Sequence, residues 1–442
     1  MSGASTAREL ALQVVRDVFG PEQRGAQASF DVRARRTQLD ARDRAFAAEL
    51  AYGSIKRRRL LDWQLKPYLG NRAKPLPPVI VEILRLGGYQ LRFMDGVDDH
   101  AAVSETVNLA WRHGHRGTAG LVNAVLRRML ADSPLVPARP EFASEDDFLG
   151  TLHSQPTWIA AQLGHAFDGE RAAVLAGLNA APQHAVRVNA LRADVATVRA
   201  EFAGRGLETH PSAFVAESLV LEAGIVADDP AGRWSLQSEA AAMPVDLLEP
   251  QPEMGDTVLD LCSGRGNKAV QLAARMGGRG ALVCVELEAK KVAVLREALE
   301  RAGAAGVAIV HGDAREAAHE LQARYVLLDA PCSGLGVIGR HPEARWRKSP
   351  ADGTRLSALQ SELLAAAGVR TAPGGRLVYS VCSSDPREGR DVVERFLAER
   401  TEFARAALPA RYTPFARDGD ILVPPGIDGR DGFFVAVLTR RS

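Results

Sequence analysis

The sequence predicts an α/β protein in two parts, with an all-helical domain at the N-terminus and a mostly parallel sheet in the C-terminal half. Apolar residues at helical spacing dominate residues 1–132. After about residue 249, short apolar runs of strand length alternate with helical segments, which is typical of a parallel sheet whose strands are joined by helices. A chain of 442 residues is too long for one compact core, so two or three domains are expected.

Charge separates the same two parts. Residues 1–130 hold 21 Lys and Arg against 13 Asp and Glu, a net charge of +8. Because the whole chain has a net charge of +1, residues 131–442 carry −7. A basic helical domain joined to a mildly acidic remainder suggests a module that binds a polyanion.

Within residues 1–132, basic side chains gather at two places. The run Lys56, Arg57, Arg58 and Arg59 directly follows the apolar positions of a helix that begins after Asp40, and the pair Arg127 and Arg128 ends a later helix. A solvated helix face is the ordinary interpretation of such a run. In a basic helical domain, contact with phosphates is the functional alternative, and we take these six residues as candidates for contact with the phosphates of a nucleic acid. Further helices are predicted over residues 78–93, 101–113 and 118–130.

The middle of the chain offers no visible chemistry. Residues 133–150 are rich in Pro, Ser and acidic residues and are predicted to form a linker. Residues 151–248 mix helical and strand patterns and are predicted to form a small α+β subdomain. The domain with the mostly parallel sheet is then expected over residues 249–442.

The first strand of that domain leads into a glycine-containing loop. A strand at 258–261 ends in Cys262, Ser263, Gly264, Arg265, Gly266, Asn267 and Lys268, and a helix follows. Backbone N–H groups at such a helix start can hold the polar end of a cofactor. Acids follow the next strands as well, at Glu286, Asp313 and Asp329, in addition to Asp260 in the first. One or two could be helix caps, but the set favours contact with a cofactor that carries a ribose and a cationic centre.

Two missing motifs exclude other cofactors. The chain has no G-x-x-x-x-G-K-[ST] loop for nucleoside triphosphates, and the glycine pattern of dinucleotide folds is incomplete. S-adenosylmethionine is the leading candidate that remains.

Two of the four cysteines follow strands of the predicted sheet. Cys332 lies in the Pro- and Gly-rich loop after the strand at 325–328, and Cys382 follows the strand at 376–379. Loops at the carboxyl ends of parallel strands are where ligands bind. Cys262 and Cys284 are interpreted as small core residues, although Cys262 belongs to the predicted cofactor loop.

The remaining patterns exclude several classes of protein. The chain has no C-x-x-C pair and no histidine pair with zinc spacing, so no metal is expected. It shows no apolar segment long enough for a signal or membrane span, which predicts a reduced, cytoplasmic protein without a membrane partner. We expect it to act as a monomer.

Longer stretches resemble known families. A-R-D-R-A-F-A-A-E-L-A-Y-G, I-L-R-L-G-G-Y-Q-L and H-G-H-R-G-T-A-G-L-V-N-A-V-L-R-R resemble a NusB-type RNA-binding domain. D-A-P-C-S-G-x-G…R-H-P-E-x-R-W, Y-S-x-C-S and D-G-F-F resemble the Sun/Nop family of RNA cytosine-C5 methyltransferases, which have a Rossmann-like catalytic domain. Taken together, nearly the whole chain resembles the bacterial members that methylate small-subunit (16S) ribosomal RNA.

The resemblance implies a role for each matching residue. Cys382 falls at the position of the family's nucleophile, and Cys332 at that of the cysteine that assists product release. Asp329 matches the acid that contacts the target base. The segment from Cys262 to Lys268, with Glu286 and Asp313, matches the S-adenosylmethionine site. The expected activity is formation of 5-methylcytosine in ribosomal RNA through a covalent cysteine–cytosine intermediate.

Departures from the family pattern leave other functions open. The first loop reads C-S-G-R-G-N-K where the family has C-A-A-P-G-G-K, which changes its backbone freedom and charge. The alternatives are a catalytically weak RNA-binding factor in ribosome assembly, a cytosine-C5 methyltransferase acting on another RNA, and a DNA cytosine methyltransferase that uses Cys332 as nucleophile.

Overall fold

The computed structural model describes residues 3–70, 75–253 and 255–442. Two compact units make up the chain. The first comprises Met1–Asn179 together with Arg340–Arg347, and the second comprises Ala180–Gly339 together with Lys348–Ser442. No helix in the described ranges is both long enough and apolar enough to cross a membrane.

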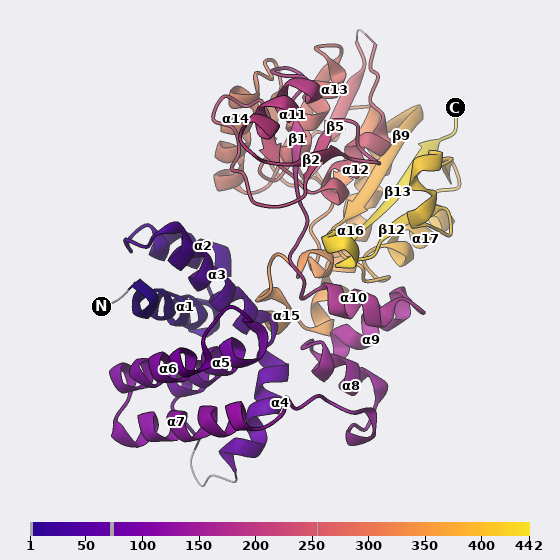
Figure 1. The fold of residues 1–442 in the computed structure, drawn as a ribbon. Helices are drawn as coiled ribbons and strands as arrows, with labels where there is room; N and C mark the ends of the chain where they lie inside the picture. The colour runs from indigo at the N-terminus through magenta and orange to yellow at the C-terminus, as the bar shows by residue number, and fades with distance from the viewer. Residues whose placement is uncertain (1–2, 71–74, 254) are drawn as a thin grey trace. The chain divides into compact units, whose positions relative to one another are not determined.

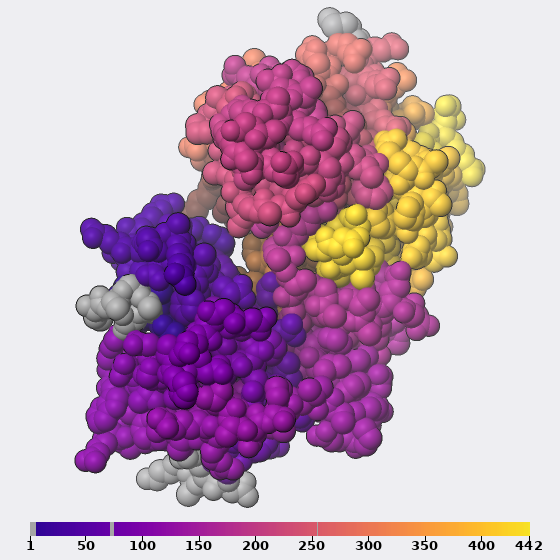
Figure 2. All heavy atoms as spheres, viewed as in Figure 1, coloured from indigo at the N-terminus to yellow at the C-terminus, as the bar shows by residue number. Residues whose placement is uncertain are grey.

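The first unit is helical, as the sequence predicts. Its described residues up to Asn179 run from indigo to magenta in Figures 1 and 2, and its helix α15 (Ala344–Arg347) is orange in Figure 1. The predicted helix at 78–93 matches α5, and those at 101–113 and 118–130 lie within α6 and α7. Asp40 caps α3 by accepting a hydrogen bond from the backbone N–H of Asp43 at 2.7 Å. The helices are α1 (Gly3–Phe19), α2 (Ala26–Ala34), α3 (Ala41–Lys56), α4 (Arg58–Leu69), α5 (Pro78–Phe93), α6 (Asp99–His113) and α7 (Arg116–Ala131).

The predicted linker is partly helical. Residues 133–150 include the 3-10 turn η1 (Arg139–Glu141) and the start of α8 (Glu145–Leu152). Ser144 caps α8 through Asp147, so the Ser and acidic residues that suggested a linker are a helix start. The first part of the predicted 151–248 subdomain, which contains α9 (Thr157–Ala166) and α10 (Arg171–Gly177), also belongs to the first unit.

A segment distant in sequence completes this unit. The guanidinium of Arg345, in α15 (Ala344–Arg347), is fully buried and donates to Asn179 Oδ1 at 2.8 Å and to the carbonyl of Leu178 at 3.0 Å. Trp346 Nε1 donates to the carbonyl of Ile55 at 2.8 Å. The R-H-P-E-A-R-W motif, which follows the Cys332 loop in the chain, is therefore a structural part of the helical unit.

The second unit begins with a small antiparallel sheet of order β2-β3-β1-β4. Its elements are β1 (His184–Val188), α11 (Val195–Gly204), β2 (Thr209–Pro211), β3 (Ser218–Leu221) and β4 (Trp234–Leu236). Phe202 of α11 packs edge-on against Trp234 in its core. Arg187 of β1 is fully buried and donates to the carbonyl of Asn267, which ties this sheet to the predicted cofactor loop.

The large sheet confirms the expected α/β architecture. Its order is β11-β12-β13-β9-β8-β5-β6-β7, with β10 paired to β13. The five strands from β9 to β7 are mutually parallel, and β10 to β13 add an antiparallel edge. The strands are β5 (Thr257–Asp260), β6 (Ala281–Glu286), β7 (Ala308–His311), β8 (Ala323–Asp329), β9 (Thr371–Val381), β10 (Phe403–Arg405), β11 (Ala416–Arg417), β12 (Asp420–Val423) and β13 (Phe433–Arg440).

Helices cover both faces of this sheet. Leu247, Leu272 and Leu295 pack on one face, from α12 (Glu239–Leu248), α13 (Asn267–Met276) and α14 (Ala289–Ala302). Leu364 and Phe396 pack on the other, from α16 (Pro350–Arg370) and α17 (Arg390–Glu399). Burial on both faces explains why these strands are continuous apolar runs in the sequence.

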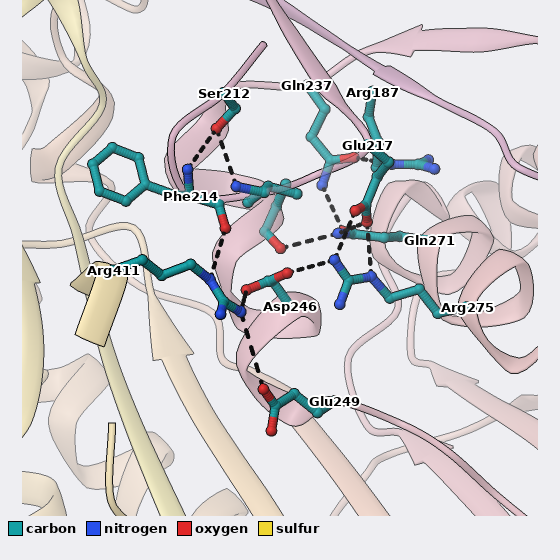
Figure 3. A network of polar contacts seen from close by, with 12 residues as sticks. Arg187, Ser212, Phe214, Glu217, Gln237, Asp246, Glu249, Gln271, Arg275 and Arg411 are labelled. Atoms are coloured by element: carbon teal, nitrogen blue, oxygen red, sulfur yellow. Dashed lines mark hydrogen bonds and ion pairs between the residues drawn. The ribbon is translucent and has the colours of Figure 1, made fainter. Parts of the chain in front are cut away.

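A polar network joins the two sheets within this unit. Figure 3 shows Asp246 of α12 between two arginines, accepting from Arg275 at 2.5 Å and from Arg411 at 2.6 Å. Arg275 also donates to Glu217, beside β3, at 2.7 Å. Since both arginines are held by carboxylates, we interpret this network as a joint between the small sheet and the catalytic sheet.

Candidate active site

Every predicted catalytic and cofactor-binding residue lies at the carboxyl ends of the parallel strands in the large sheet. β5, β6, β7, β8 and β9 are parallel, so their carboxyl ends meet at one edge. Asp260, Glu286 and Asp329 end β5, β6 and β8. Asp313 comes two residues after β7, and Cys382 directly follows β9. This edge is the ligand-binding edge of open α/β sheets.

The two cysteines singled out from the sequence are in contact. Cys332 Sγ lies 3.2 Å from Cys382 Sγ, and both side chains are partly exposed. The contact with Cys382 and burial together raise the pKa of the Cys332 thiol well above its ordinary value. Cys332 is therefore held as a neutral thiol near neutral pH.

Asp329 is held between the cofactor loop and the strand that carries Cys382. Its Oδ2 accepts from Lys268 Nζ at 2.6 Å, and its Oδ1 accepts from Ser380 Oγ at 2.8 Å. Burial opposes the charge on Lys268, but Asp329, with smaller contributions from Cys382 and Asp260, raises the pKa of that ammonium. A buried cation therefore lies close to both Asp329 and Cys382.

The loop from Cys262 to Lys268 is ordered by Glu286. One carboxylate oxygen of Glu286 accepts from the backbone N–H of Gly264 at 2.8 Å, and the other accepts from that of Glu288 at 2.8 Å. Gly266 has φ +95°, and a Cβ there would lie 2.9 Å from Leu295 Cδ1, so only glycine fits. Arg265 and Asn267, which depart from the family pattern, are exposed.

Asp260 is an orphaned buried acid beside this loop. Both of its carboxylate oxygens are fully buried with no hydrogen-bond partner in the structure. Burial raises the pKa of Asp260 to about 7. An unpartnered acid at the end of the first strand fits a polar or cationic group of a bound cofactor, because such a group would satisfy it. Asp313, in contrast, is paired with Arg315, whose hydrogen bonds lower the pKa of the carboxyl.

The other two cysteines lie in or against the core. Cys284 is fully buried in β6, and Cys262, the first residue of the cofactor loop, packs against the core. Burial raises the pKa of both thiols. Across the described parts of the chain, no group of three or more His, Cys, Asp and Glu could hold a metal ion.

The candidate RNA-binding residues are in the first unit, and they differ in whether their side chains are used in internal contacts or exposed. Arg58 pairs with Glu82 at 2.9 Å, and Arg59 pairs with Asp147 at 2.5 Å. Arg57 lies over the ring of Phe93, and burial lowers the pKa of Lys56 to about 8. Much of the 56–59 run is thus used in packing. Arg127 and Arg128 at the end of α7 are exposed.

Several site residues were missed by sequence reasoning. Ser380 positions Asp329, while Ser333, Ser383 and Glu388 form a buried cluster beside the cysteines. The available signal was the repeated Cys-Ser pair, at 332–333 and 382–383, with an acid six residues after Cys382. A lone buried glutamate gives no periodicity or spacing that could identify it in advance.

Three models of known protein families match the chain. The family model for the 16S rRNA methyltransferase RsmB/F matches residues 245–439, and the NusB family model matches residues 5–131. The RsmF/B-like ferredoxin-like domain matches residues 155–227. The three matches follow one another along the chain.

Relatives match over nearly the full length. Ribosomal RNA small subunit methyltransferase B of Thermus thermophilus is 36% identical over 442 residues, covering 99% of this chain and 98% of that protein. The protein of the same description from Pseudomonas syringae is 35% identical over 91% of both chains. The crystal structure of PH0851 has a TM-score of 0.80 at 25% identity and covers 99% of both chains. This chain belongs to the RsmB/F family of 16S rRNA methyltransferases.

Proposed function

We propose that this protein forms 5-methylcytosine in small-subunit ribosomal RNA, using S-adenosylmethionine as methyl donor and Cys382 as nucleophile. The observation that carries the proposal is the pair of thiols 3.2 Å apart at the ends of neighbouring parallel strands, beside Lys268 and Asp329. The relatives bear the description of small-subunit ribosomal RNA methyltransferases.

The cofactor would be held at the carboxyl ends of β5, β6 and β7. The segment Cys262 to Lys268 offers backbone N–H groups at the start of α13, and Glu286 and Asp313 offer carboxylates to hydroxyl and amino groups. The unpartnered Asp260 fits a cationic end. When bound, S-adenosylmethionine supplies an electrophilic methyl group on a sulfonium.

Cys382 begins the reaction. Carbon 5 of cytosine is a poor nucleophile, and addition of the Cys382 thiolate to carbon 6 moves the electron pair of the ring double bond toward carbon 5. The positive charge of Lys268 lies close to Cys382 and stabilises negative charge on that sulfur during the addition. After carbon 5 has gained the methyl group, a base removes its proton, the ring double bond re-forms, and the Cys382 sulfur leaves as thiolate.

Asp329 acts at the start of the reaction, and Cys332 acts at its end. Addition of sulfur at carbon 6 builds negative charge on the ring, which is offset when ring nitrogen 3 takes up a proton from solvent. The Asp329 carboxylate then accepts a hydrogen bond from that ring N–H. Cys332, kept neutral beside Cys382, assists release of the product after methylation. Access to both faces of the ring requires the cytosine to leave its stack.

The basic helical unit would bind the RNA backbone. Its net charge and the exposed Arg127 and Arg128 support this role, to which Lys56, Arg57, Arg58 and Arg59 contribute as far as their internal contacts permit. We infer that the protein acts as a monomer in the cytoplasm, where ribosomal RNA is its partner. Light scattering of the free protein tests the first point.

Trapping of the covalent intermediate tests the function. Cys332→Ala and Cys382→Ala are each incubated with S-adenosylmethionine and unmodified 16S ribosomal RNA, and denaturation-resistant protein–RNA adduct is measured. We expect the Cys332 variant to accumulate adduct and the Cys382 variant to form none, because release fails in the first and addition in the second.

The other outcomes identify the alternatives. The reverse pattern would assign the nucleophile to Cys332, as in a DNA-type cytosine methyltransferase. No adduct from either variant, with no S-adenosylmethionine bound by the natural protein, would favour a binding factor in ribosome assembly. Adduct with another RNA but not with 16S ribosomal RNA would identify that other RNA as the substrate.

A further inference from the structure

Each of the two active-site cysteines is followed by a buried serine. Ser333 follows Cys332 and Ser383 follows Cys382, and the two Oγ atoms lie 3.0 Å apart. The loops that leave β8 and β9 are therefore joined twice, once at the sulfur atoms and once at the serine hydroxyls. The second joint lies away from the reacting atoms and is organised around one side chain, Glu388.

The carboxylate of Glu388 is fully buried and accepts hydrogen bonds from both loops. Its Oε2 accepts from the backbone N–H of Ser333 at 2.7 Å and from Gln360 Nε2 at 3.1 Å. Its Oε1 accepts from Ser383 Oγ at 2.8 Å and also from Ser333 Oγ. Gln360 in turn donates to the carbonyl of Pro331, the residue before Cys332, at 2.8 Å.

Four donors converge on the two oxygens of Glu388, and the carboxylate accepts from all four. Glutamine of the same size would place an NH₂ group where one oxygen accepts two hydrogen bonds, and because that NH₂ cannot accept, both serine hydroxyls would have to turn and accept from it. The four donors are neutral groups, so the negative charge of Glu388 is spread over hydrogen bonds. That charge lies close enough to Cys332 to be among the causes that raise the pKa of its thiol, after contact with Cys382 and burial.

We propose that Glu388 is a positioning residue that holds Cys332 and Cys382 at sulfur-to-sulfur contact by bridging the serines that follow them. The inference rests on the proposed roles of the two cysteines and adds how their distance is fixed. Because Glu388 touches neither sulfur, it acts through the two loops. Its charge also adds to the contact with Cys382 and to the burial that keep the Cys332 thiol neutral.

Kinetics of Glu388→Gln provide the first test, with Glu399→Gln as the matched control on the exposed side of α17. With S-adenosylmethionine and 16S ribosomal RNA, we expect Glu388→Gln to lower kcat at least about tenfold. The KM for RNA and the Kd for S-adenosylmethionine should stay within about threefold of the natural protein, because neither binding surface is changed. Parallel loss of cofactor affinity and kcat, or an unfolded circular dichroism spectrum, would mean a general structural role and would overturn the proposal.

The ionisation of Cys332 provides the second test, which a merely structural role would not move. In a Cys382→Ala background, alkylation of Cys332 by iodoacetamide is followed against pH by mass spectrometry. Adding Glu388→Gln should lower the midpoint by about one pH unit, because a nearby negative charge is removed. Adding Glu399→Gln should leave it unchanged. Equal midpoints in the two double variants would overturn the proposal.

The two hypotheses fail separately. Methyltransferase activity retained by Cys382→Ala would contradict the proposed function, in which Cys382 is the nucleophile. Loss of activity in Cys382→Ala together with full activity in Glu388→Gln would contradict only the positioning role of Glu388 and would leave the proposed function standing.

Discussion

Lys268 Nζ donates to Asp329 Oδ2 at 2.6 Å, joining residues that are 61 positions apart in the chain. Lys268 is the second residue of α13, at the end of the cofactor loop, and Asp329 ends β8 directly before the Cys332 loop. The pair thus links the two halves of the reaction site. Asp329 also accepts from Ser380, two residues before Cys382, so a single carboxylate connects the cofactor loop with both cysteine-bearing strands.

Replacing Lys268 by Met should lower kcat by at least about 100-fold, because it removes the cation beside Cys382 and leaves the Asp329 carboxylate without its partner. In the Cys332→Ala background the same change should abolish the trapped RNA adduct. Lys291→Met, which breaks an exposed pair with Glu288, is the control and should change neither quantity. Unimpaired adduct formation in Lys268→Met would show that Cys382 does not depend on this cation.

The same pair predicts how stability changes at high pH. The pKa of Lys268 is raised in the folded protein, so its contribution is fully present below about pH 10.5 and is lost as the pH rises through the folded value. The difference in Tm between the natural protein and Lys268→Met should therefore be constant from pH 7 to about pH 10 and should shrink above that. A difference that already falls between pH 7 and 9 would contradict this assignment.

Asp260→Asn tests the buried, unpartnered acid. The pKa of Asp260 is about 7 in the folded protein and about 3.8 in the unfolded chain, so the folded state binds the extra proton between these values. Stability of the natural protein without cofactor should fall as the pH rises from about 4 to about 7, by on the order of 4 kcal/mol from this group alone.

The neutral Asn cannot titrate, so the stability of Asp260→Asn relative to the natural protein should rise over this range and level off above it. Urea unfolding at several pH values measures the difference. Affinity for S-adenosylmethionine should fall in the same variant, since a carboxylate available to a cationic group is lost. Parallel stability curves for the two proteins would show that Asp260 is not perturbed.

The elements that carry the site were predictable because their patterns are local. The apolar runs before Asp260, Glu286 and Asp329 are buried on both faces, and each falls within a strand of the structure. Because the carboxyl ends of parallel strands share an edge, the acids and the two cysteines could be brought together from sequence spacing alone. The resemblance of the motifs then distinguished the two cysteines.

The rest depended on contacts between distant segments. Nothing local shows that Arg345, in a motif that resembles a catalytic one, is buried in the helical unit, or that Glu388 bridges two loops. The basic run at 56–59 was interpreted from its charge, but charge alone does not reveal that Arg58 and Arg59 have acidic partners. The helix at 145–152 was missed because acids at a helix start resemble a solvated linker.

Arg345→Met should destabilise the helical unit. Its guanidinium is fully buried and satisfies Asn179 Oδ1 and the Leu178 carbonyl, both of which would lose a buried donor. A loss of about 2–4 kcal/mol is expected from unsatisfied buried acceptors. Calorimetry should show a lower Tm for one transition, whereas Arg42→Met, at an exposed position of α3, should have no measurable effect. An unchanged thermogram for Arg345→Met would contradict the burial of this side chain.

The two groups of basic residues should separate RNA binding from stability. Arg127→Ala with Arg128→Ala removes exposed charges and should weaken binding to 16S RNA without changing Tm by more than about 2 °C. If both contact phosphates, the slope of log Kd against log salt concentration should fall by about 1–2. Arg58→Ala and Arg59→Ala should instead lower Tm, because Glu82 keeps only Arg85 as a partner and Asp147 loses its pair with Arg59. An unchanged salt slope in the Arg127 and Arg128 double variant, measured beside a reduced slope in a stably folded Arg58 or Arg59 variant, would place the phosphate contacts on the 56–59 run instead.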